Sequence, residues 1–147
     1  MSDERPTLAD YRWHRPFATR WHDNDVFGHI NNTIYYAAMD TTVTSWLLGN
    51  GHAMTEAHSD PAVVIASSCR YFASGAFPDT LVVGLKADRV GTTSVSWGLG
   101  IFREEDGALL ATGTFVHVFV DRDDRRPIPV PPPVRERITA ELVTAAT

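Results

Sequence analysis

The residues with the clearest capacity for chemistry lie in one short stretch, RWHDNDVFGHINNTIYY at residues 20–36. It holds two carboxylates, Asp23 and Asp25, followed by Asn31 and Asn32, where the pattern turns helical. The N-terminus of a helix has backbone N–H groups without internal partners and a partial positive charge, so it can stabilise an oxyanion on a bound carbonyl. In this interpretation Asp25 is the reactive neighbour of that oxyanion.

The same polar residues also have a purely structural interpretation. Asp and Asn side chains commonly close turns and cap helices. For Asp23 and Asn31 we expect this role, as a cap or as support for the loop.

Length, composition and charge narrow the class of protein. A chain of 147 residues with 44% hydrophobic residues suits a single domain over residues 1–147 with one core. The net charge is −5 and the basic pair Arg125-Arg126 is too short to neutralise phosphates, so we expect no nucleic-acid partner.

Cysteine content and the N-terminal residues indicate the compartment. The single cysteine, Cys69, predicts a buried free thiol and a reducing environment. The N-terminus is acidic where a signal peptide is basic, and no apolar run approaches membrane-spanning length. We therefore expect a cytoplasmic protein without a membrane partner.

The hydrophobic pattern predicts one long helix and five strands. Residues 1–14 are expected to form a loose arm before a strand at 17–21, and a helix is predicted at 33–48. Strands are predicted at 62–72, 81–90, 93–102 and 109–120, followed over 127–147 by a proline-rich connection and a short helix at 134–144. The predicted buried face of the long helix comprises Tyr35, Ala38, Met39, Thr42, Val43 and Trp46, widened by Ala37 and Leu47.

This order of elements predicts an α+β domain in which an antiparallel five-stranded sheet wraps around the long helix. Gly98 and Gly100 leave one face of their strand bare, which permits close approach of another element or a sharp bend, and we expect the sheet to curl there. An open sheet has unpaired edges, so we expect a homodimer formed by edge pairing, or a homotetramer.

The pattern RWxDxDxxGHxNNxxY at residues 20–35 closely resembles the signature of the hotdog-fold acyl-CoA thioesterases, in the branch of 4-hydroxybenzoyl-CoA thioesterase and its YbgC-like relatives. AFPDTL at 76–81 and VGT at 90–92 also resemble that family, and the resemblance covers about residues 15–132. Relatives often carry an acid where Ala37 stands and an arginine where Val43 stands.

The resemblance implies the hotdog fold, an oligomer, and hydrolysis of an acyl-CoA or aroyl-CoA bound at a dimer interface, with coenzyme A as part of the substrate and no other cofactor. It assigns the catalytic carboxylate to Asp25 and the N–H that polarises the thioester carbonyl to Asn32. Substrate-binding positions correspond to Gly28, which lets the loop pass close to the ligand, and to His29, Asn31 and Tyr35.

Three other functions are compatible with parts of the stretch. A divalent metal could be held by His22, Asp23, Asp25 and His29, although no His-x-x-x-His pair supports this and we expect no metal. His29 could be the base of a hotdog hydratase or dehydratase. A module that only binds acyl or aromatic ligands is the third, but it gains little from an ionised carboxylate beside an apolar pocket.

Overall fold

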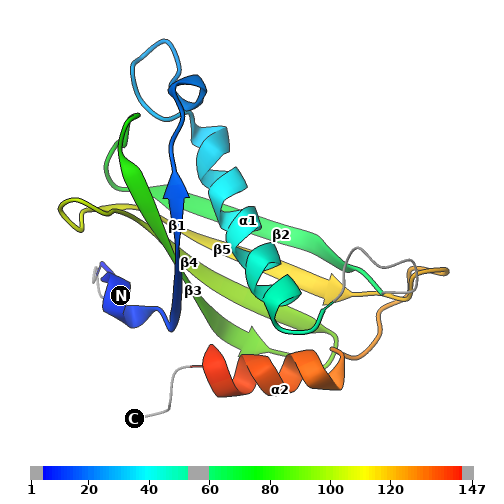
Figure 1. Ribbon diagram of the computed structural model, residues 1–147. Helices are drawn as coiled ribbons and strands as arrows, with labels where there is room; N and C mark the ends of the chain where they lie inside the picture. The colour runs from blue at the N-terminus through cyan, green and yellow to red at the C-terminus, as the bar shows by residue number, and fades with distance from the viewer. Residues whose placement is uncertain (1–4, 53–59, 144–147) are drawn as a thin grey trace.

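The computed structural model describes residues 5–52 and 60–143, and the chain forms one antiparallel sheet with a long helix across one face (Figure 1). Neighbouring strands follow the order β1-β3-β4-β5-β2. The predicted α+β hotdog architecture is thereby confirmed. The elements are β1 (Trp13–Ala18), α1 (Asn32–Gly49), β2 (Ala62–Tyr71), β3 (Thr80–Val90), β4 (Ser94–Arg103), β5 (Leu109–Phe119) and α2 (Pro132–Glu141), with 3-10 turns at Leu8–Asp10 and Trp21–Asp23.

Helix α1 buries one face against the sheet, as the hydrophobic spacing predicts. Ala37 is exposed, so its inclusion in that face was wrong, because it lies on the opposite side of the helix from the sheet. The helix ends where Asn50 N–H bonds the carbonyl of Leu47 and Gly51 adopts a φ of 87°. Its buried residues are Tyr35, Ala38, Met39, Thr42, Val43, Trp46 and Leu47.

The core lies between α1 and the concave face of the sheet, and α2 closes one end of it. Trp46 of α1 and Trp97 of β4 meet with ring centroids 5.9 Å apart, and Trp97 Nε1 donates to Nδ1 of His117 at 2.8 Å. Val134, Ile138 and Leu142 of the C-terminal segment are part of the same core. No helix in residues 5–52 or 60–143 is long and apolar enough to cross a membrane.

The first strand differs from the prediction of residues 17–21, because β1 spans Trp13–Ala18 and residues Trp21–Asp23 form a 3-10 turn. The Asp23 carboxylate accepts a hydrogen bond from the backbone N–H of Arg20 at 2.8 Å, which turns the chain there. The other four strands begin and end within one residue of their predicted limits. Helix α2 begins two residues before its predicted start. Its first turn contains prolines, which lack a backbone N–H, and in that turn an N–H would have no partner within the helix.

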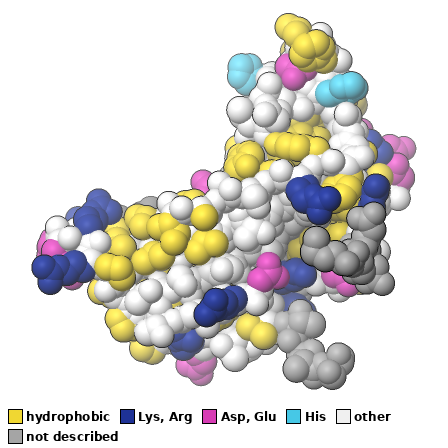
Figure 2. Space-filling model, turned by 180° about the vertical axis from the view of Figure 1, so that it is seen from behind, with side chains coloured by type: hydrophobic (Ala, Val, Ile, Leu, Met, Phe, Trp, Pro, Cys, Tyr) yellow, Lys and Arg dark blue, Asp and Glu magenta, His cyan; other side chains and the backbone are white. Residues whose placement is uncertain are grey.

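The face of the sheet away from α1 is covered in part by the N-terminal segment. The ring of Tyr11 lies on Gly84 and Gly100, where a Cβ would come within 2.6 Å of it, and packs edge-on against Phe102 at 5.9 Å. Figure 2 shows this face, with small side chains and backbone in white across its middle. Gly84 and Gly100 therefore permit the close approach of Tyr11, whereas Gly98 faces the Asp88 carboxylate, and the arm predicted as loose is anchored by a residue 5% exposed.

We predict that Tyr11→Ala lowers the free energy of unfolding by about 3 kcal/mol, because it empties an aromatic site that nothing else fills. Urea titration followed by tryptophan fluorescence measures this change. Arg12→Ala, at the exposed neighbouring position, is the control and is expected to change stability by less than about 0.5 kcal/mol. Equal stability of the Tyr11 variant and wild type would mean that the arm is not anchored.

Candidate active site

The motif loop, residues 20–31, joins β1 to α1 and is held together by Asp23. Asp23 is 1% exposed, and its carboxylate accepts hydrogen bonds from the backbone N–H and the guanidinium of Arg20, each at 2.8 Å. Burial alone would raise the pKa of Asp23, but the hydrogen bonds and charge of Arg20 outweigh it and hold the pKa below its usual value. The predicted role of Asp23 in supporting the loop is confirmed.

Asp25 lies at the turn of the motif loop with its carboxylate held from two sides. The N–H of Phe27 donates to Oδ1 at 2.9 Å, and Nδ2 of Asn31 donates to Oδ2 at 3.4 Å. The backbone N–H of Asp25 bonds the carbonyl of His29 at 2.9 Å, and its carbonyl accepts from Gly28 at 3.0 Å. The carboxylate is partly exposed and oriented, as a reacting group requires.

Asn31 caps helix α1, as predicted. Its Oδ1 accepts hydrogen bonds from the backbone N–H of Thr33 at 3.0 Å and from the Thr33 hydroxyl at 2.8 Å, and its carbonyl accepts from Ile34 at 2.9 Å. The N–H of Asn32, the first residue of α1, has no acceptor among residues 5–52 and 60–143. The Asn31 side chain thus contacts the Asp25 carboxylate and also caps α1, whose first N–H has no acceptor among the described residues.

Two hollows flank the start of α1. The larger, of about 890 Å³, contains Asp25 in its wall, and the smaller, of about 360 Å³, contains Asn32. The larger is lined by Trp21, His22, Asn24, Asp25, Val26, Phe27, Gly28 and Asn31. The smaller is lined by Ile30, Asn32, Tyr35, Tyr71, Phe72, Ala73 and Ser74.

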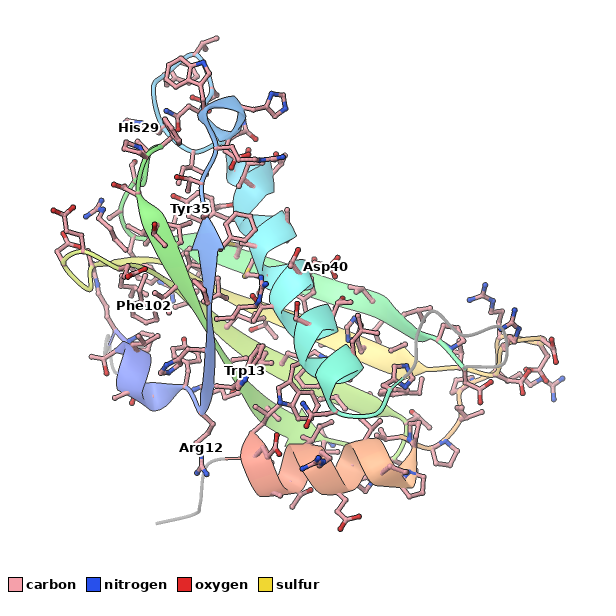
Figure 3. The ribbon with its side chains drawn as sticks, in the orientation of Figure 1. Arg12, Trp13, His29, Tyr35, Asp40 and Phe102 are labelled. Carbon is pink, nitrogen blue, oxygen red and sulfur yellow. The ribbon has the colours of Figure 1, made fainter. Side chains whose placement is uncertain are left out.

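Tyr35 lies in the wall of the smaller hollow, on the side of α1 that faces the sheet (Figure 3). Its hydroxyl accepts a hydrogen bond from Gly75 N–H at 3.2 Å, and its ring meets that of Tyr71 edge to face at 5.3 Å. The hydroxyl of Tyr71 in turn donates to the carbonyl of Asn32 at 3.4 Å. Sequence reasoning missed Tyr71, because no local pattern connects the end of β2 with the start of α1.

His29 is exposed and lines neither hollow; Figure 3 places it to the left of the start of α1. The four candidate metal ligands do not converge, since the Asp23 carboxylate is bound to Arg20. In the part of the chain that the structure describes, no three His, Cys, Asp or Glu residues are grouped to hold a metal ion. The substrate-binding roles of Gly28, His29, Asn31 and Tyr35 stay predictions.

The rim of the larger hollow is apolar and exposed. Trp21, Val26 and Phe27 are 75%, 93% and 81% exposed, and Trp21 meets Phe77 edge to face at 6.1 Å. In Figure 2 this end of the molecule shows hydrophobic side chains next to histidines. Apolar side chains around a carboxylate suit an apolar ligand or a second protein surface.

Comparison with known proteins identifies the class. The family model described as the Thioesterase-like superfamily matches residues 19–138. Because that match spans most of the chain, the chain belongs to the Thioesterase-like superfamily. The enzyme class predicted from the motif, a thioester hydrolase, is confirmed. No match was found among curated proteins.

Solved structures show the same fold. The PA5185 protein from Pseudomonas aeruginosa is 40% identical, with a TM-score of 0.89 over 98% of this chain and 100% of that chain. A 1,4-dihydroxy-2-naphthoyl-CoA thioesterase from Synechocystis is 19% identical, with a TM-score of 0.80 over 86% and 94% of the two chains. A thioesterase from Thermus thermophilus complexed with coenzyme A and zinc is 24% identical, with a TM-score of 0.76 over 88% and 93%.

Gly28 is required for its backbone conformation, since its φ is 78° while a Cβ there would meet nothing within 4 Å. We predict that Gly28→Ala costs about 1 kcal/mol of stability and lowers thioester hydrolysis at least 10-fold, because the strained turn displaces Asp25. Gly51→Ala is a matched control, with a φ of 87°, equally open surroundings and a place at the far end of α1.

Urea titration and initial rates measure the two quantities. The Gly51 variant is expected to lose similar stability and no activity. Equal activity loss in both variants would show that general strain, and not the position of Asp25, is responsible.

Proposed function

We propose that this protein is an acyl-CoA thioesterase, which hydrolyses an acyl-CoA or aroyl-CoA to the free acid and coenzyme A. The single observation that carries the proposal is the arrangement at Asn31, whose side chain both contacts the Asp25 carboxylate and caps the helix that presents the open Asn32 N–H. A carboxylate and an oxyanion donor, here connected through one side chain, are the two groups that carboxylate-assisted thioester hydrolysis requires.

Two reaction routes are compatible with this geometry. In the first, an Asp25 oxygen bonds to the thioester carbon, the C–S bond breaks to release coenzyme A, and water then hydrolyses the mixed anhydride. In the second, Asp25 takes a proton from water while the hydroxide oxygen bonds to the carbonyl carbon, and the C–S bond breaks afterwards. In both, the carbonyl oxygen becomes negative and accepts a hydrogen bond from Asn32 N–H.

The smaller of the two hollows beside the start of α1 is suited to the acyl part of the substrate. The acyl group would lie against Tyr35 and Tyr71 in the smaller hollow, with the thioester carbonyl at Asn32. This chain is similar to a 1,4-dihydroxy-2-naphthoyl-CoA thioesterase and to a thioesterase complexed with coenzyme A. Both similarities support a coenzyme A ester as the substrate. A free thiol at Cys69 agrees with a cytoplasmic location.

We further propose that the working unit is at least a homodimer, paired through β2. The two edge strands of the sheet are β1 and β2. β1 has six residues including Pro16, which discourages edge pairing, whereas β2 has ten residues without proline. Val64 and Ile65 of β2 are 45% and 62% exposed, and the strand ends at Tyr71 in the smaller hollow. A partner strand there would cover the apolar edge and close the hollow.

We predict that the double variant Val64→Lys/Ile65→Lys is monomeric, because two buried ammonium groups in the new interface would be costly. Light scattering at micromolar concentration measures the mass. Leu48→Lys, at a 47% exposed position at the end of α1, is the control and keeps the wild-type mass. A wild-type protein that is monomeric and fully active would contradict the dimer.

We predict that Asp25→Asn lowers kcat by about 100-fold or more, equivalent to about 3 kcal/mol of transition-state stabilisation, with KM nearly unchanged. The amide keeps the shape of the side chain and one oxygen that can accept the Phe27 N–H, but it lacks the anionic oxygen, and its NH2 group cannot accept from Asn31 Nδ2. Hydrolysis of a panel of acyl-CoAs, followed with a thiol reagent, measures both constants.

Glu136→Gln removes one negative charge from an exposed position on α2 and serves as the control. It is expected to keep wild-type turnover. Near wild-type kcat for Asp25→Asn would show that the catalytic carboxylate has been assigned wrongly.

A further inference from the structure

A second loop, residues 72–79, joins β2 to β3 and supports the motif loop. The N–H of Ile30 donates to the carbonyl of Gly75 at 2.8 Å, and the N–H of Phe77 donates to Oδ1 of Asn24 at 2.9 Å. Asn24 and Ile30 pair with each other as an isolated antiparallel bridge, with Asp25 between them. We call residues 72–79 the bracing loop, because it contacts the motif loop on both sides of Asp25.

The bracing loop fits tightly against the motif loop. A Cβ at Gly75 would lie 3.0 Å from Cδ1 of both Ile30 and Leu110, closer than ordinary packing allows. The same residue donates its N–H to the Tyr35 hydroxyl. A displacement of the bracing loop must therefore move the motif loop or the first turn of α1 with it.

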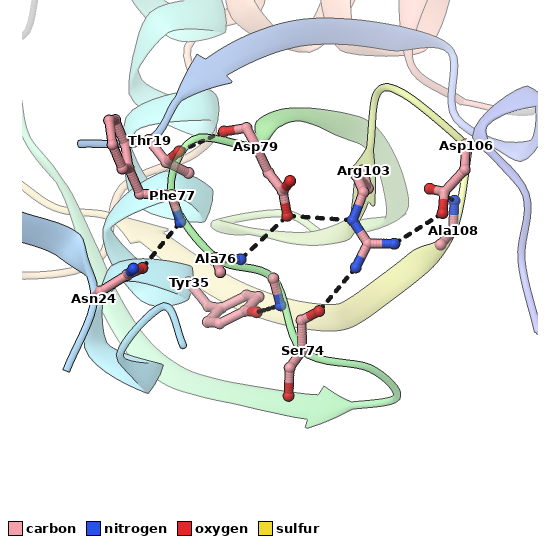
Figure 4. A network of polar contacts seen from close by, with 11 residues as sticks. Thr19, Asn24, Tyr35, Ser74, Ala76, Phe77, Asp79, Arg103, Asp106 and Ala108 are labelled. Atoms are coloured by element: carbon pink, nitrogen blue, oxygen red, sulfur yellow. Dashed lines mark hydrogen bonds and ion pairs between the residues drawn. The ribbon is translucent and has the colours of Figure 1, made fainter. Parts of the chain in front are cut away.

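Arg103, at the end of β4, holds the bracing loop in place (Figure 4). Its guanidinium donates to the carbonyl of Ser74 at 2.9 Å, to Oδ2 of Asp79 at 3.2 Å and to Oδ2 of Asp106 at 2.8 Å. Asp79 Oδ2 also accepts the N–H of Ala76 at 3.1 Å. One planar cation thus binds the beginning and end of the bracing loop and anchors both to the β4–β5 hairpin.

Both the chemistry and the position of Arg103 suit it to holding the bracing loop. Its side chain is 23% exposed, and the hydrogen bonds from Arg103 to the Asp106 and Asp79 carboxylates raise its pKa. Three donors in a rigid plane fix three acceptors in relative position, which the single flexible ammonium of lysine cannot do. Arg103 lines neither hollow beside the helix start.

We propose that Arg103 is a positioning residue for thioester hydrolysis, which sets the place of Asp25 relative to the Asn32 N–H through the bracing loop. This proposal rests on the proposed function. The contacts run from Arg103 to Ser74 and Asp79, from the bracing loop to Asn24 and Ile30, and from these to the turn that holds Asp25. Small misplacements of reacting groups cost large factors in rate, about 100-fold for 1 Å.

The test compares Arg103→Lys with wild type on the acyl-CoA that wild type hydrolyses fastest. Lysine keeps the charge and loses the planar fork, so kcat is expected to fall about 10-fold while KM stays within about 2-fold. Arg137→Ala, which breaks the exposed pair with Glu141 on α2, is the control and keeps both constants. All rates are measured well below the melting temperature and divided by the folded fraction, so that lost stability does not imitate lost positioning.

A double-mutant cycle tests the route through the bracing loop. Asn24→Ala removes the hydrogen bond to Phe77 without touching Arg103. If both residues act on Asp25 through the same loop, the double variant Asn24→Ala/Arg103→Lys is expected to be about as slow as the slower single variant. Losses in kcat that multiply would overturn the route.

Unchanged kcat in Arg103→Lys, or a loss seen only in KM or stability, would overturn the positioning role while wild-type turnover upholds the proposed function. Absence of wild-type hydrolysis of any acyl-CoA would instead overturn the proposed function. If Arg103→Lys fails to fold, Asn24→Ala alone decides: a kcat equal to wild type overturns the proposal, and a 10-fold loss supports it.

Discussion

The packing of α1 on the sheet is the constraint on which the rest of the structure depends. Met39 lies over Gly113 of β5, where any side chain would clash with it, and Trp46 packs on Trp97 further along the helix. These contacts set the position of α1 along and across the sheet. Because the helix is rigid, they also set where its first N–H groups lie relative to the neighbouring loops.

The motif loop then has little freedom of its own, although it is largely exposed. Its inner residues are held by buried or backbone contacts, as in the pairing of Asp23 with Arg20 and of Ile30 with Gly75. Its outer residues, Val26 and Phe27, have exposed side chains, and the Phe27 N–H donates to Asp25 Oδ1. Because its inner residues are fixed and its outer residues are apolar and exposed, the motif loop can place Asp25 precisely and also contact a ligand or a partner surface.

The site also depends on segments that are distant in the chain. Tyr71 at the end of β2 and Ser74 in the bracing loop line the hollow that contains Asn32. Arg103 connects that loop to the β4–β5 hairpin. The strand that ends at Tyr71 is an edge strand, so the proposed pairing through β2 would also close this hollow.

The sequence by itself determined the long helix, four of the five strands and the place of the motif loop, because periodic burial and helix caps are local signals. It misplaced the first strand, because the turn at Asp23 depends on a specific ion pair, and it left Tyr11 in a loose arm. Only the tertiary structure brought Tyr71 to the hollow that contains Asn32 and Arg103 to the bracing loop. Their contacts join residues 39 and 29 positions apart, which depend on strand order and register rather than on any local pattern.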